Sequence, residues 1–73
     1  MKTYLVLFFN SNGWVPSKVM DKAKELGFEV VVGAHDLVYE WESEPSEEEI
    51  LDLGDKVKET LEGSGVFFKL ETV

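Results

Sequence analysis

The residues best suited to acid–base chemistry in this chain are His35 and Asp36, which are adjacent. An imidazole titrates near neutral pH, so a histidine held by a carboxylate can move protons. Glu40 follows four residues after Asp36 and is a second candidate for proton transfer. The alternative is a simple turn, in which His35 is exposed and the Asp36 side chain bonds to nearby backbone. The local turn chemistry favours this alternative, and no serine has the sequence context of a catalytic nucleophile.

A second candidate site is the loop Asn10–Ser11–Asn12–Gly13, which precedes a helix expected to begin at Pro16. Backbone N–H groups near a helix N-terminus can bind small polar ligands. Trp14 follows the loop, and we expect its ring to cover the helix end. The candidate ligand-binding residues are therefore Asn12, Gly13, Gly33, His35, Asp36 and Glu40.

The composition removes several classes of chemistry. The 73 residues include no cysteine, which excludes disulfides, zinc–thiolate centres, iron–sulfur clusters and thiol nucleophiles. They also include no arginine, which excludes bidentate clamps on phosphate or carboxylate. Glu40, Glu42 and Glu44 alternate along an expected strand, and the run 47–49 fits a helix first turn. We therefore predict no metal and no other cofactor.

The net charge of the chain argues against one class of partner. Fifteen acidic and seven basic side chains give a formal net charge of −8, which argues against binding to nucleic acid. The apolar run Tyr4–Phe9 is too short for a signal sequence or a membrane span. We expect a cytoplasmic protein with no membrane partner.

The first half of the chain predicts a strand, a helix and a second strand. Residues 3–9 are aliphatic, aromatic or β-branched, as in a strand buried on both faces. Pro16 suits the first turn of a helix, and Gly27 ends it. Residues 28–33 predict the second strand.

The second half predicts the same elements in the same order. Residues 34–36 form a tight connection to a third strand over 37–42. Ser46 and Glu49 have the spacing of a capping box, and an apolar stripe follows at helical spacing. A glycine-rich stop at 63–65 leads to a last strand over 66–72. We predict one α+β domain over 1–73, a ferredoxin-like βαββαβ sandwich with a four-stranded antiparallel sheet and two helices on one face.

The alternation in the strands predicts which side chains leave the core. Leu37, Tyr39 and Trp41 should face the helices with the rows beginning at Phe28 and Val66. The first strand is apolar on both sides, so either Tyr4, Val6 and Phe8 or Leu5, Leu7 and Phe9 face outward. The open face then carries apolar residues at its centre and charged residues around them: Glu29, Val31, Val38, Glu40, Glu42, Phe67, Lys69 and Glu71. Such a patch is typical of an interface or a ligand site.

The stretch from Gly33 to Thr72, GAHDLVYEW followed by a capped helix and LEGSGVFFKLET, resembles the RAM domain of the Lrp/AsnC family and its stand-alone relatives. The matching positions are Gly33, Asp36, Gly65, Val66 and Thr72. The resemblance implies a dimeric α/β-barrel in which two open sheet faces pack together and small-molecule effectors bind at subunit interfaces. The Asn12–Gly13 loop with Leu26–Gly27–Phe28 is also similar to an ACT domain, another amino-acid-binding module.

Together these features predict a small self-associating regulatory or binding module. Its partners would be a homodimer or higher homo-oligomer through the open sheet face, and an amino-acid-like ligand at the subunit interface. One alternative is a small enzyme of the dimeric α/β-barrel type, an isomerase or cofactor-free oxygenase using His35 or Glu40. Another is an adaptor whose acidic surface meets a basic protein.

Overall fold

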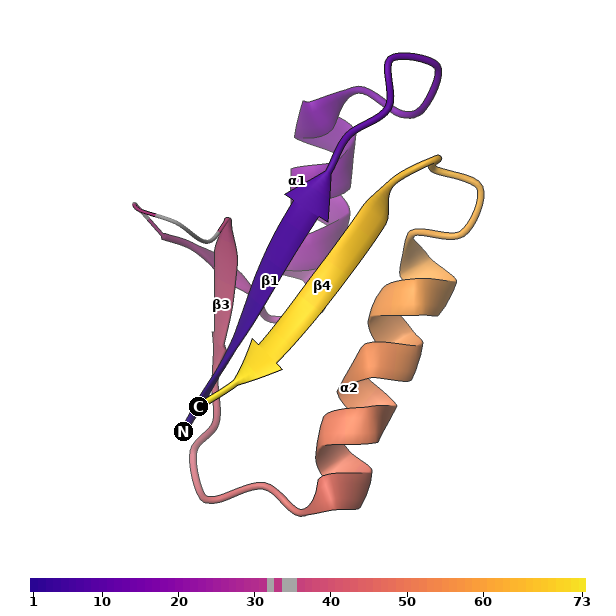
Figure 1. Cartoon of the computed structure of the whole chain (residues 1–73). Coiled ribbons are helices and arrows are strands. Elements are labelled where there is room, and N and C mark those ends of the chain that lie inside the picture. Colours follow the sequence, from indigo (N-terminus) through magenta and orange to yellow (C-terminus); the bar gives the residue numbers. More distant parts are fainter. Residues whose placement is uncertain (32, 34–35) are drawn as a thin grey trace.

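The computed structural model describes residues 1–31, 33 and 36–73. Its elements are β1 (Lys2–Phe8), α1 (Pro16–Glu25), β2 (Glu29–Val30), β3 (Leu37–Glu40), α2 (Glu47–Thr60) and β4 (Phe67–Thr72). The strands form one antiparallel sheet in the order β2-β3-β1-β4, so β1 and β3 are central (Figure 1). This is the predicted ferredoxin-like topology.

Both helices begin where the sequence predicts. Pro16 occupies the first turn of α1, where its missing N–H costs no helical hydrogen bond. Ser46 caps α2: its Oγ accepts the N–H of Glu49 at 3.1 Å, and the Glu49 carboxylate accepts the N–H of Ser46 at 3.0 Å. This reciprocal pair satisfies two N–H groups that would otherwise lack partners at the helix start.

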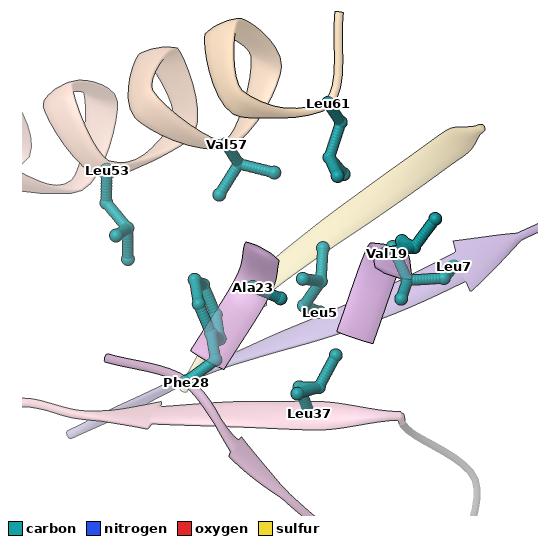
Figure 2. Packing of buried hydrophobic residues seen from close by; sticks show 9 residues of the cluster. All are labelled: Leu5, Leu7, Val19, Ala23, Phe28, Leu37, Leu53, Val57 and Leu61. Carbon is teal, nitrogen blue, oxygen red and sulfur yellow. The ribbon is translucent and has the colours of Figure 1, made fainter. Parts of the chain in front are cut away.

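The structure resolves the orientation of β1, which the sequence left open. Leu5 and Leu7 are buried on the side of the helices, where they pack against residues of α1 and α2 (Figure 2). Tyr4 and Val6 are only partly buried, and Phe8 is 53% exposed. Tyr4, Val6 and Phe8 therefore belong to the open face. The sequence predicts that β1 is buried on both faces, and this is correct only for the side chains that face the helices.

The second strand is shorter than predicted. Among the described residues, only Glu29 and Val30 pair with β3, although the Val31 N–H also bonds to the Asp36 carbonyl at 3.2 Å. Val30 lies opposite Leu37, which places it on the helix side, but its side chain is 55% exposed. The helices therefore leave the side chain of Val30 uncovered at the β2 edge of the sheet. Phe28 is 2% exposed and packs edge-to-face on Tyr39, as expected for a core residue.

Candidate functional site

The Asn12–Gly13 loop has a packing role at the end of β1. The Asn12 N–H bonds to the Asn10 side chain at 2.9 Å, and the Gly13 N–H bonds to the Asn10 carbonyl at 2.9 Å. The next residue, Trp14, donates its N–H to the Ser64 carbonyl at 2.9 Å. A Cβ at position 13 would lie 2.2 Å from that same carbonyl oxygen. Gly13 is therefore required for the contact between this loop and the one before β4.

A shallow depression of about 240 Å³ lies beside this loop, and Gly13 is one of its lining residues whereas Asn12 is not. Trp14, also a lining residue, packs against the core cluster, as expected for a side chain that covers the helix end. Its ring already carries a cation, because the Lys18 Nζ lies 4.2 Å from the ring centroid.

Asp36 extends the pairing between β1 and β3 with its side chain. Its Oδ2 accepts the N–H of Leu7 at 2.7 Å, and its own N–H donates to the Leu5 carbonyl at 3.2 Å. Among the described residues, the paired register runs as far as Leu5 and Leu37. The carboxylate supplies an acceptor for the backbone N–H of Leu7 beyond that pair.

This geometry predicts that Asp36 contributes to stability whether or not a ligand binds. Asp36→Ala should lower the free energy of unfolding by about 1–3 kcal/mol, because it leaves the Leu7 N–H without an acceptor. Asp36→Asn keeps an acceptor oxygen of the same reach and should lose less. Urea denaturation of the two variants measures the difference. Equal losses would show that the bond to Leu7 is not what Asp36 contributes.

The remaining candidate residues do not gather around Asp36. Glu40 is exposed at the far end of β3, where its carboxylate lies 3.5 Å from the Lys2 Nζ. Four residues of strand separate it from Asp36, a distance of about 13 Å. Gly33 is exposed with φ +130°, and a Cβ there would meet no atom within 4 Å. His35 lies outside the described residues, so the predicted His35–Asp36 pair stays a prediction.

The open face of the sheet carries an apolar band along β1 and into its neighbours. Phe8 of β1 lies directly opposite Phe67 of β4, and these side chains are 53% and 75% exposed. Val6 and Tyr4 continue the band along β1. Val38 of β3 lies between Tyr4 and Glu29 in the register and is 5% exposed. We call the set Tyr4, Val6, Phe8, Val38 and Phe67 the apolar band.

Charged residues border the apolar band on the same face. The strand positions contribute two lysines and three glutamates, a net charge of −1, whereas the whole chain carries −8. The lysines are already paired within the chain: Lys2 with Glu40 at 3.5 Å and Lys69 with Glu71 at 2.7 Å. The open face is therefore much closer to neutral than the rest of the molecule.

A cleft that the sequence does not predict lies on the helix side, between the end of β3 and the first half of α2. It consists of two adjoining depressions of about 280 and 230 Å³, both lined by Tyr39, Trp41 and Glu49. Alternation places Tyr39 and Trp41 in the core row, and they do pack against the core cluster, but both side chains stay partly exposed. We call this the aromatic–acidic cleft, because Glu42 and Asp52 also line it.

Neither the acidic residues nor the helices of the described part of the chain suggest other site types. No group of three or more His, Cys, Asp or Glu residues there is placed to hold a metal ion. No helix there has the length and apolar character needed to cross a bilayer.

Comparison with known proteins finds no match to a family model, to a curated protein or to a solved structure. The resemblance to RAM and ACT domains therefore stays a prediction.

Proposed function

We propose that this chain is a self-associating binding module whose copies pair through the open face of the sheet. The observation that carries the proposal is the apolar band, in which Phe8 and Phe67 form a cross-strand pair that is largely exposed in the single chain. Large aromatic side chains that stand together on a surface are typical anchors of protein interfaces. A second copy covers the band and removes both rings from water.

The charges on the open face support a second copy as the occupant. A chain with a net charge of −8 repels itself, and the repulsion is weakest where the two surfaces in contact are nearly neutral. With a net charge of −1 over its strand positions, the open face meets this condition.

The pairing also requires enough buried area. A stable protein interface of standard size buries about 800 Å² on each partner. That is about one sixth of the 4950 Å² accessible surface of this chain. A small domain without disulfides gains most from such burial, because its own core is limited.

The proposal includes a small amino-acid-like ligand at the subunit interface and a cytoplasmic location. The ligand is supported by the RAM-like stretch and by Glu40, which is exposed beside the open face. The location is supported by the absence of cysteine, because small secreted domains typically carry disulfides and this chain can form none. No contact of Glu40 favours an enzyme over this module, since its carboxylate already pairs with Lys2.

Sedimentation equilibrium at high micromolar concentration tests the pairing. The wild-type chain should sediment as a species heavier than its monomer mass of 8.3 kDa. Phe67→Lys should weaken the association at least tenfold, about 1.4 kcal/mol, because it places an unpaired cation in the apolar surface that the second copy would bury.

The matched control is Leu51→Lys. Leu51 is also a large apolar residue, 61% exposed, but it belongs to α2 rather than to the sheet. The control makes the same change in charge and should leave the association unaltered. A wild-type chain that stays monomeric, or equal losses in the two variants, would refute pairing through the open face.

A further inference from the structure

The geometry of the aromatic–acidic cleft points to a second binding site, for a small organic cation with a primary ammonium group. We infer that the cation sits against the rings of Tyr39 and Trp41 and pairs with the carboxylates of Glu42 and Asp52. Glu40 of the open face borders one end of the cleft, but no residue of the apolar band lines it, so the site does not depend on the proposed pairing through that band.

The two aromatic rings carry the inference. Their centroids are 4.8 Å apart with an interplanar angle of 63°, and both rings line both depressions of the cleft. The Trp41 Nε1–H donates to the buried Thr3 Oγ1 at 2.8 Å, and that oxygen also pairs with the Thr72 hydroxyl at 2.8 Å. The only polar atom of the indole thus points into the protein, and the ring offers the cleft carbon and π surface alone.

Such a surface binds cations better than anions. The face of an indole or phenol ring is negative, and an ammonium group within about 6 Å of its centroid is attracted to it. The same protein shows this preference at Trp14, where the Lys18 ammonium lies over the ring at 4.2 Å. No lysine of the described residues lies over the Trp41 ring, which packs edge-to-face with Tyr39 and is partly exposed where it lines the cleft.

The carboxylates around the rings supply the matching charge. Glu42 and Asp52 line the cleft and are exposed, and among residues 1–31, 33 and 36–73 neither has a recorded ion pair. Glu49 also lines it, although one of its oxygens caps the Ser46 N–H. Asp52 and Lys56 line only the second depression, and Glu40 lines the first together with Glu42. Glu40 is already paired with Lys2 at 3.5 Å, so Glu42, which has no such pair among the described residues, is the preferred partner of the ammonium group.

The size of the cleft limits the ligand. Sites for drug-sized ligands measure about 300–1,000 Å³, and the larger depression here measures about 280 Å³. This volume suits an alkylammonium of the size of a lysine side chain. The alkyl part would lie on the rings while the ammonium reaches the carboxylates, as lysine stems do on apolar surfaces.

Titration with n-butylammonium, followed by the indole N–H resonances in a ¹H–¹⁵N spectrum, tests the site. The two tryptophans give one resonance each, and Trp14 is an internal control because Lys18 already occupies its ring face. At constant ionic strength, the Trp41 resonance should shift saturably with a dissociation constant on the order of millimolar, while Trp14 stays in place. Butyrate, with a similar alkyl chain and the opposite charge, should cause no saturable shift.

Two double variants with the same change in charge complete the test. Glu42→Gln/Asp52→Asn should weaken butylammonium binding about fivefold, since each exposed charge contributes modestly. Glu59→Gln/Glu62→Gln removes two exposed carboxylates, one in the last turn of α2 and one just beyond it, and should leave the affinity for butylammonium unchanged. An unmoved Trp41 resonance, an equal response to butyrate, or equal affinities of the two variants would overturn the inference. None of these changes alters a residue of the apolar band, so this test can fail while the association test succeeds, and the reverse.

Discussion

Gly13→Ala is expected to lower the free energy of unfolding by about 3 kcal/mol, from overpacking and a lost hydrogen bond. The added methyl group would lie 2.2 Å from the Ser64 carbonyl oxygen, which belongs to the backbone and cannot rotate away. Relieving the clash requires the two loops to separate, and this breaks the bond between Trp14 and Ser64. Gly65 is equally constrained, since its φ is +75° and a Cβ there would lie 3.3 Å from the Gly13 Cα.

Gly54→Ala is the matched control for this prediction. A Cβ at Gly54 would lie 3.6 Å from Leu70 Cδ1, an ordinary contact, and the residue is inside α2. The substitution should therefore raise the stability by up to about 1 kcal/mol, because alanine favours a helix more than glycine does. Thermal unfolding of both variants without any ligand gives the comparison. A Gly13→Ala variant as stable as the wild type would show that the two loops are not packed together.

Leu5→Ala is the second change with a large expected effect. Leu5 is fully buried at the centre of β1, among residues of both helices and of β3 (Figure 2). Removing its side chain should lower the free energy of unfolding by about 3–5 kcal/mol. This loss combines the hydrophobic free energy of the removed atoms with the cost of the cavity that they leave. A chain of this length has a total stability of about 4–11 kcal/mol, so much of it would be lost. The melting temperature should fall by about 15 °C or more.

The control for Leu5→Ala is the same substitution at an exposed position. Leu51→Ala removes the same atoms from a side chain that is 61% exposed on α2, and it should change the stability by less than about 0.5 kcal/mol. Both variants must be compared at one protein concentration, because association stabilises the folded chain. Similar losses for the two variants would contradict the assigned core.

The local features of the fold are predictable from the sequence because they depend on near neighbours. The capping box joins Ser46 to Glu49, three residues apart, and Pro16 fixes the start of α1 through its own ring. The orientation of β1 was not predictable, because both rows of its side chains are apolar. It is set by contacts with helices distant in the chain. The second strand was predicted too long because its apolar run continues beyond the residues that pair with β3.

The candidate site shows the same limit. Gly13 packs against Ser64, which is 51 positions away, and Asp36 binds Leu7, which is 29 positions away. No pattern of neighbouring residues predicts contacts between positions so far apart. Alternation correctly places Tyr39 and Trp41 on the helix side. It gives no information on how completely the helices cover them, and so the aromatic–acidic cleft was missed. The open face was predictable in outline, because the alternation of β3 and β4 is clear.

The most direct test of the proposed pairing is a dilution series of ¹H–¹⁵N spectra, from high to low micromolar concentration. Pairing through the open face predicts concentration-dependent shifts at Val6, Phe8 and Phe67, with no change at Leu51 or Asp55 of α2. Spectra that do not change with concentration while the protein sediments as a monomer would contradict the pairing. Shifts confined to α2 would contradict it too.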